Sequence, residues 1–315
     1  MTFKYLVTGG AGFLGSNLIS KLLEKNCEII CFDNEFRGKF TNLPESERIN
    51  IVKGDITNYS EWEKLDKDLD GIFHLAAING THLFYSIPDK VLNVNVKGTI
   101  NALEFTKNNK IPYFSFASSP EAYGIPSKFP TTEETPLLIP NITNPRWSYG
   151  ASKIIGEIYC ANYSSKFNFK CSIIRYHNTY GPNDFSGHVI PDLINKIIKN
   201  KELDVEGTGD ETRSFSYVTD VIDATLLILE KQEKKLDVFN VGIDRETNIK
   251  NLIKILQQIS GKKLNPIFRE LKNPGTARRL PEISKIRNLG YKPKINLEEG
   301  LKKTYQWHMD NHLEK

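Results

Sequence analysis

The sequence of 315 residues lacks several features that define other classes of protein. It contains no apolar run of the ~18 residues that a membrane span needs, so we expect no membrane segment. Cysteine is scarce, and its four copies form neither a C-x-x-C pair nor a zinc spacing. We therefore expect free thiols in a reducing compartment. The four positions are Cys27, Cys31, Cys160 and Cys171.

A large excess of one charge is also missing. The 42 Lys and Arg residues and the 38 Asp and Glu residues leave a net charge of +4, which gives no support for nucleic-acid binding but suits a small anionic ligand. A predicted strand begins at Phe3, which leaves no room for a signal peptide, so we expect the cytoplasm. His308 and His312 are spaced i, i+4 without a third ligand nearby, and we expect no metal site.

What the chain does have is a glycine-rich turn at its start. Residues 3–8 predict a short strand and residues 13–24 a helix, and between them glycine recurs at every third position (Gly9, Gly12, Gly15). A backbone without Cβ lets a pyrophosphate approach closely, and the N–H groups of the following helix point at that anion. The next predicted strand, 28–32, ends at Asp33, whose carboxylate suits the ribose hydroxyls of an adenosine. The pattern predicts a dinucleotide site.

Strands and helices alternate through the first half of the chain. Strands are predicted at 48–53, 71–77, 112–119 and 170–175, with helices at 90–109 and 149–166. This order predicts an α/β fold with a Rossmann-type, doubly wound parallel sheet. Beyond residue 176 the rhythm is irregular and predicts a smaller C-terminal α/β lobe, with residues 238–241 returning to the main sheet. We expect the dinucleotide domain at 1–175 and about 214–242, and the substrate lobe at 176–213 and 243–315.

Tyr149 and Lys153 are four residues apart, hence on one face of a predicted helix. A free tyrosine, with a pKa near ~10, is a poor base at neutral pH, and a nearby ammonium group favours its phenolate. The pair alone fits an ordinary surface contact, but its place downstream of a dinucleotide fold favours a catalytic role. Ser119 ends the preceding strand, where its hydroxyl can bind the same substrate oxygen. Glu121 is either a second base or a plain loop carboxylate.

Further motifs follow in order along nearly the whole chain: residues 8–15, 54–56, 74–77, 95–99, 118–124, 149–153, 175–182 and 207–221. With these motifs the chain resembles the extended short-chain dehydrogenase/reductases of the NAD-dependent epimerase/dehydratase family, which modify nucleotide sugars. The resemblance implies an NAD cofactor and a UDP-, GDP-, CDP- or dTDP-linked sugar. It also implies a homodimer through a four-helix bundle, to which each copy would contribute residues 91–107 and 151–163.

The resemblance also implies roles for single positions. Tyr149 would be the catalytic base, Ser119 its hydroxyl partner, and Lys153 would bind the nicotinamide ribose and lower the pKa of Tyr149. Asp33 would hold the adenosine ribose and disfavour NADP. Other implied cofactor contacts are Gly9, Gly12, Phe13, Leu14, Asn34, Asp55, Ile56, Leu75, Ala76, Ala77, Asn95, Ala117 and Tyr176. Implied substrate contacts are Thr81, Asn178, His188, Val189, Arg213 and Arg278, the last of which fits a solvated basic turn equally well.

Departures from the family pattern bear on the reaction. Pro120 stands where 4,6-dehydratases carry an aspartate, which disfavours ordinary 4,6-dehydration. Glu121 remains, as in decarboxylating members. We therefore predict removal of hydride from the sugar C4 by a 4-dehydrogenase or 4-epimerase. The alternative is a decarboxylase, C3/C5-epimerase or dehydratase that uses Glu121. A non-catalytic NAD-binding module is a third interpretation, which the intact Ser119, Tyr149 and Lys153 disfavour.

Overall fold

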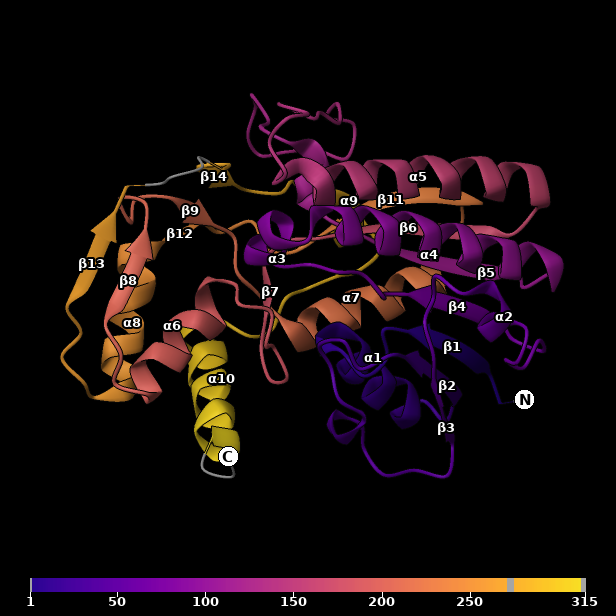
Figure 1. Cartoon of the computed structure of the whole chain (residues 1–315), viewed down its shortest axis with the longest axis horizontal. Helices are drawn as coiled ribbons and strands as arrows, with labels where there is room; N and C mark the ends of the chain where they lie inside the picture. Colours follow the sequence, from indigo (N-terminus) through magenta and orange to yellow (C-terminus); the bar gives the residue numbers. More distant parts are fainter. Residues whose placement is uncertain (1, 271–274, 313–315) are drawn as a thin grey trace.

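A seven-stranded parallel sheet forms the centre of the computed structural model, which describes residues 2–270 and 275–312 (Figure 1). The strand order is β11-β6-β5-β4-β1-β2-β3, and each neighbouring pair is parallel. The strands are β1 (Lys4–Thr8), β2 (Glu28–Asp33), β3 (Ile49–Lys53), β4 (Gly71–His74), β5 (Tyr113–Ser118), β6 (Lys170–Tyr176) and β11 (Leu236–Val241). Residues 238–241 therefore do return to the main sheet.

Helices cover both faces of this sheet. Successive side chains of a strand point to opposite faces, so Val7 packs into one core with α1 (Phe13–Glu24) and α7 (Val218–Lys231). Leu6 packs into a second core under α4 (Pro88–Asn108) and α5 (Trp147–Phe167), with the short α2 (Tyr59–Trp62) beside α4. Because both faces are buried, the strands are apolar almost throughout. The predicted doubly wound α/β fold is confirmed.

The direction of winding reverses next to β1. From β1 the chain moves outward to β2 and β3, then returns to place β4 on the other side of β1. In parallel α/β sheets this reversal opens a crevice at the carboxyl ends of the two central strands, and ligands bind there. The glycine turn follows β1 and the segment 75–80 follows β4, so both border the crevice.

The second half of the chain builds a smaller unit at the carboxyl ends of the central strands (Figure 1). Its helix α8 (Ile249–Ser260) buries Ile249, Leu252, Ile253 and Leu256, which are spaced for one helical face. The other helices are α6 (Val189–Ile198), α9 (Ser284–Asn288) and α10 (Leu297–His312). The short strands are β7 (Thr179–Tyr180) with β10 (Ser216–Tyr217), β8 (Leu203–Glu206) with β13 (Pro266–Arg269), and β9 (Thr212–Arg213) between β12 (Thr247–Asn248) and β14 (Arg278–Arg279).

Several details differ from the prediction. β4 ends at His74 because residues 75–77 leave the sheet to line a cavity, and β13, β14 and α3 (Thr81–Ser86) were not expected. The remaining short helices are η1 (Phe40–Asn42) and η2 (Pro120–Tyr123). The four cysteines are buried free thiols. None of the helices in residues 2–270 and 275–312 combines the length and hydrophobicity that a membrane span requires. The proposed domain boundaries stay a prediction.

Candidate active site

A cavity of about 1000 Å³ runs along the carboxyl ends of the central strands and is closed on one side by the smaller unit. Most residues that the sequence analysis selected line it. They are Gly9, Gly12, Phe13, Leu14, Asp33, Asn34, Asp55, Ile56, Leu75, Ala76, Ala77, Thr81, Ala117, Ser119, Glu121, Tyr149, Lys153, Tyr176, Asn178, His188, Val189 and Arg213. Residues far apart in the sequence thus meet around one space.

The glycine turn forms one end of the cavity. Gly9 has a φ of +68°, and a Cβ on Gly15 would lie only 2.1 Å from the carbonyl oxygen of Gly9, so the turn can close only with glycine at both positions. The helix α1 begins behind it with no side-chain cap and no acidic residue in its first turn. Its first N–H groups and its positive dipole end are therefore available to an anion.

Asp33 ends β2 beside this turn. Its carboxylate accepts hydrogen bonds from the N–H groups of Ala11, at 3.1 Å, and Glu35, at 2.7 Å, and burial raises its pKa above the usual range. A fixed carboxylate here fits the ribose hydroxyls of an adenosine. Turn, helix and carboxylate together fit a dinucleotide with a free 2′-hydroxyl.

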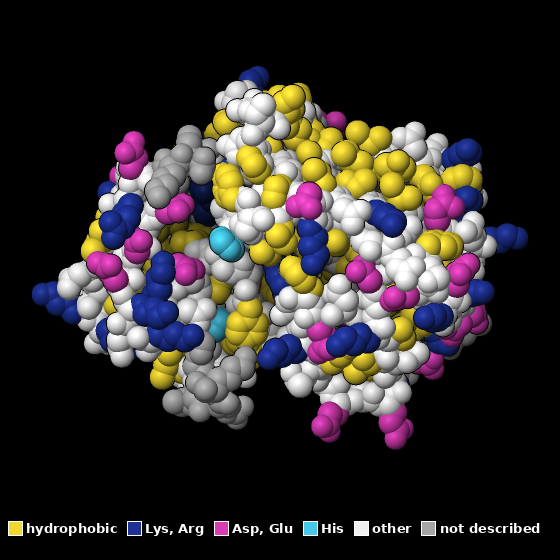
Figure 2. All heavy atoms as spheres, viewed as in Figure 1, with side chains coloured by type: hydrophobic (Ala, Val, Ile, Leu, Met, Phe, Trp, Pro, Cys, Tyr) yellow, Lys and Arg dark blue, Asp and Glu magenta, His cyan; other side chains and the backbone are white. Residues whose placement is uncertain are grey.

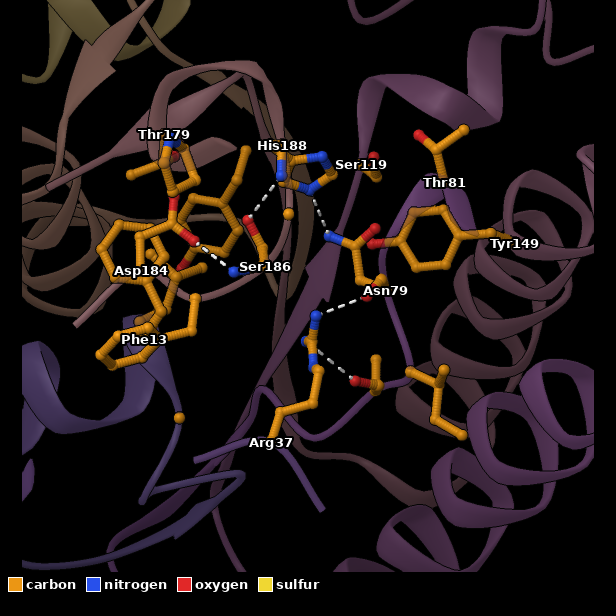
Figure 3. A pocket seen from close by; sticks show the side chains of 18 of the residues that line it. Phe13, Arg37, Asn79, Thr81, Ser119, Tyr149, Thr179, Asp184, Ser186 and His188 are labelled. Carbon is orange, nitrogen blue, oxygen red and sulfur yellow. Dashed lines mark hydrogen bonds between the residues drawn. The ribbon is translucent and has the colours of Figure 1, made fainter. Parts of the chain in front are cut away.

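Tyr149 lies at the opposite end of the cavity, on the first turn of α5 (Figure 3). Its ring stacks on Phe84 of α3 with the centroids 5.0 Å apart, and its hydroxyl is hydrogen-bonded with Ser119. The Oγ of Ser119 already accepts the N–H of Glu121 at 3.2 Å, so its own proton is free to be donated to the phenolic oxygen. Lys153 Nζ lies 5.5 Å from the centroid of the Tyr149 ring.

The charges around Tyr149 do not by themselves make it acidic. Burial raises its pKa above the usual range, and the opposing effects of Ser119 and Arg37 are smaller. Burial also lowers the pKa of Lys153 to about 8. The net shift of Tyr149 is thus opposite to the one expected from the sequence, because that expectation counted the neighbouring ammonium group but not the loss of hydration.

Glu121 lies near Tyr149 among three guanidinium groups. Its Oε1 is 2.9 Å from Nη2 of Arg279 and 3.6 Å from Nη2 of Arg146. Burial alone would raise its pKa, but Arg279, Arg146 and Arg213 together lower it. Burial and Arg279 lower the pKa of Arg213 to about 10. The carboxylate therefore stays ionised among these three guanidinium groups.

The smaller unit contributes polar groups to the same wall. The Nδ2 of Asn178 is buried without a hydrogen-bond partner among the described residues, as a group that waits for a ligand would be. His188, just before α6, lies 3.2 Å from the amide nitrogen of Asn79 (Figure 3). Burial raises the pKa of Asp184 and lowers that of His188, while each of the two opposes the shift of the other.

Two selected residues lie outside the cavity. Asn95 is buried behind its wall, where its amide accepts the N–H of Ile78 at 2.8 Å and donates to the carbonyl of Ile78 at 3.2 Å. Arg278 points away and forms a two-nitrogen hydrogen-bonded pair with Glu246. Its neighbour Arg279 lines the cavity instead.

Many lining residues were not selected from the sequence, and Arg37, Phe84, Arg146 and Arg279 are the ones that bear on the site described above. Arg146 carried a signal, because it precedes Tyr149 by three residues and hence by about one helical turn. The others carried none. Nowhere in the described residues do three His, Cys, Asp or Glu side chains gather in a way that could hold a metal ion. The side chain of His312 lies outside the described residues.

Comparison with known proteins identifies the family. Residues 5–242 match the model of the NAD dependent epimerase/dehydratase family. The chain belongs to this family. The resemblance seen in the sequence is therefore confirmed, and the cofactor is NAD. The family description spans epimerases and dehydratases, so membership alone does not choose the reaction.

Similar proteins carry different activities in their names. A putative UDP-glucose 4-epimerase of Methanocaldococcus jannaschii is 36% identical over 97% of this chain and 98% of its own length. A UDP-N-acetyl-alpha-D-glucosaminuronate decarboxylase of Bacillus cytotoxicus is 30% identical over 98% of each chain. The crystal structure of UDP-glucuronic acid 4-epimerase from Bacillus cereus, in complex with UDP-glucuronic acid and NAD, superimposes with a TM-score of 0.89 at 30% identity, over 98% of this chain and 100% of that chain.

Proposed function

We propose that this protein oxidises a nucleotide sugar at C4, with NAD as hydride acceptor and Tyr149 as the group that removes the hydroxyl proton. One observation carries the proposal: Tyr149, Ser119 and Lys153 converge at the end of the cavity that faces the glycine turn. The dinucleotide end and the acid–base end are therefore two ends of one space.

The chain's own residues divide the work. Bound NAD supplies the hydride acceptor. Ser119 donates a hydrogen bond to O4 of the sugar. The phenolate of Tyr149 removes the proton of the C4 hydroxyl group, and Lys153 holds positive charge beside that phenolate. Because burial alone keeps Tyr149 protonated, ionisation has to be favoured by the positive charges assembled around it once the site is filled.

The nucleotide portion is assigned to the smaller unit. Arg213 and Asn178 line the cavity there, and the Nδ2 of Asn178 has no hydrogen-bond partner among the described residues. Both suit the oxygens of a diphosphate, and the guanidinium can bind phosphate with two parallel hydrogen bonds. His188 and Val189, at the start of α6, would meet the nucleobase. If the enzyme releases the 4-keto sugar, it is a 4-dehydrogenase. If it returns the hydride to the other face of the 4-keto sugar, it is a 4-epimerase.

A deuterium label tests this function. UDP-, GDP-, CDP- and dTDP-sugars are first screened with NAD for those that raise the unfolding temperature. Those that bind are then supplied with deuterium at C4. Deuterium on the nicotinamide in a rapidly quenched single turnover supports the proposal, whether the label then stays there, as in a 4-dehydrogenase, or returns to C4, as in a 4-epimerase. Conversion of the sugar without any transient deuterated NADH would overturn it.

A second candidate rests on the pairing of Glu121 with arginines. Arg279 and Arg146 hold one carboxylate already, and the same geometry suits the C6 carboxylate of a uronic sugar. After oxidation at C4 such a sugar is a β-keto acid. Its C5–C6 bond can break with loss of CO₂, while the electron pair enters the C4 carbonyl and a proton adds at C5. Incubation in D₂O would show deuterium at C5 and release of CO₂; the absence of both would exclude this reaction.

We also propose that two copies associate through α4 and α5. These helices pack against each other, and their outward face exposes Leu92, Ile155 and Ile158. Figure 2 shows hydrophobic side chains gathered over this part of the surface. An apolar helical face of this kind suits an antiparallel four-helix bundle with a second copy.

A further inference from the structure

Arg37 reaches into the crevice from the loop after β2. Its Nη1 donates to the carbonyl oxygen of Asn79 and its Nη2 lies 3.4 Å from that of Ala77, both in the segment after β4 (Figure 3). The side chain therefore crosses from the end of β2 to the end of β4, over the carboxyl end of β1, which lies between these two strands. This is where the sheet topology places the pyrophosphate of a dinucleotide.

The backbone at Arg37 is fixed directly on the glycine turn. A Cβ on Gly38, the next residue, would lie 2.1 Å from the carbonyl oxygen of Ala11 and 2.6 Å from the N of Gly12. Asn42 donates to the same Ala11 oxygen at 3.0 Å, and Asp33 accepts the Ala11 N–H. The loop that carries Arg37 and the turn expected to hold the phosphates are thus one packed unit.

Arg37 forms no ion pair with a carboxylate within the described residues. Its acceptors there are two neutral carbonyls, and no described carboxylate lies within the 4.0 Å of an ion pair. The side chain is exposed, and it lines the cavity. Desolvation within the cavity lowers the pKa of Arg37, and Tyr149, Asp184 and Asp33 oppose this shift from beyond ion-pair distance. A guanidinium in this situation is suited to an anionic ligand.

We infer that Arg37 binds the pyrophosphate of NAD together with the N-terminus of α1. The helix offers N–H groups and a partial charge, whereas Arg37 adds a full charge and a planar fork of donors. Its hydrogen bonds to the two carbonyls hold the fork over the crevice before the cofactor arrives. Arg37 is thereby a cofactor-binding residue in addition to those that the sequence motifs indicate.

The inference rests on NAD being the cofactor, and binding measurements test it apart from turnover. Dissociation constants for NAD, ADP-ribose, ADP and adenosine are measured by calorimetry on wild type and on Arg37→Ala, Arg37→Lys and Lys39→Ala, after removal of co-purified nucleotide. Lys39 is the matched control, because it carries the same charge in the same loop but does not line the cavity.

We expect Arg37→Ala to weaken the three phosphorylated ligands about 10- to 100-fold and to leave adenosine within about twofold, since a hydrogen bond to a charged group contributes ~1.5–3 kcal/mol. The affinity of Arg37→Lys for these ligands should lie between those of wild type and Arg37→Ala. The affinities of Lys39→Ala should match those of wild type. Equal loss of adenosine affinity, or unchanged NAD affinity in Arg37→Ala, overturns the inference. Failure of the wild type to bind NAD would instead count against the proposed function.

Discussion

The ammonium nitrogen of Lys153 lies 5.5 Å from the centroid of the Tyr149 ring. It also donates a hydrogen bond of 2.6 Å to the carbonyl oxygen of Ala117 in β5, so the position of the ammonium group is set by the sheet and not by α5 alone. Both side chains are nearly fully buried. A helix turn and a strand end therefore fix the two groups relative to each other, and the following predictions depend on that geometry.

Replacement of Tyr149 by phenylalanine should lower kcat about 10²- to 10⁴-fold, the usual contribution of a positioned acid–base group. The stack on Phe84 survives in this variant, so NAD affinity should stay within about twofold of wild type. Formation of enzyme-bound NADH after addition of a nucleotide sugar, followed by absorbance, measures the effect. Turnover at the wild-type rate would remove Tyr149 from the mechanism.

Lys153 should make stability depend on pH. Its pKa is about 8 in the folded protein against an ordinary value of 10.5, so between these pH values the unfolded chain binds more protons. Stability then rises with pH across that window, by ~3 kcal/mol for this group, and the penalty is complete below pH 8. Urea unfolding of wild type and Lys153→Met at pH 7, 8, 9 and 10 isolates the effect. A stability difference that stays constant with pH would contradict it.

The change Glu121→Gln should destabilise the protein by ~3–5 kcal/mol, because it leaves buried guanidinium groups without their carboxylate. The same change raises the positive charge of the cavity, so UDP should bind several-fold tighter and restore part of the lost stability. Calorimetry and thermal unfolding measure both effects, with the exposed Glu134→Gln as control. Normal stability and normal UDP affinity would argue that Glu121 is not a charge partner.

Two adjacent arginines provide a matched comparison. Arg279 lines the cavity and contacts Glu121, whereas Arg278 is held outside by Glu246. We expect Arg279→Ala to raise the KM for the nucleotide sugar at least about tenfold, since it removes a charged hydrogen-bond donor. Arg278→Ala should change KM less than about threefold. Steady-state kinetics on the two variants decide the assignment, and the reverse order would show that the two roles are exchanged.

The outward face of α5 should govern association. Ile158 is exposed there, with Leu92 and Ile155 beside it on the same apolar surface. A charge at Ile158 in a helix–helix interface would be buried without a partner, so Ile158→Asp should shift the protein from dimer to monomer. Light scattering measures the mass. Ile142→Asp is the control, because Ile142 is almost fully exposed on a loop. A monomeric wild type would contradict the proposed dimer.

Much of the fold was predictable because it is written in local patterns. α1 was predicted with the bounds that it has, and β2, β6 and α5 within two residues, because apolar periodicity and the glycine turn are properties of neighbouring residues. β13 and β14 were missed, since each is short and exists only through its pairing with β8 or β9. The selected residues from Gly9 to Arg213, apart from Asn95, line one cavity, which the parallel strand order explains.

The sequence did not predict which arginine side chains line the cavity. Arg278 and Arg279 are consecutive residues of a two-residue strand, and consecutive side chains of a strand point to opposite sides. Which of them faces the cavity follows from the pairing of β14 with β9, and the sequence does not specify that pairing. In the sequence Arg37 is likewise an ordinary loop residue. Its place over the crevice follows from the packing of Gly38 on the glycine turn, which is a tertiary contact.

The sequence by itself determined the family, the cofactor and the doubly wound parallel class of the central sheet, because these follow from motifs and patterns of neighbouring residues. Only the tertiary structure decided which charges meet in the cavity and whether each gains or loses a proton. A pKa depends on burial and on groups brought together from distant segments, and no local pattern contains that information.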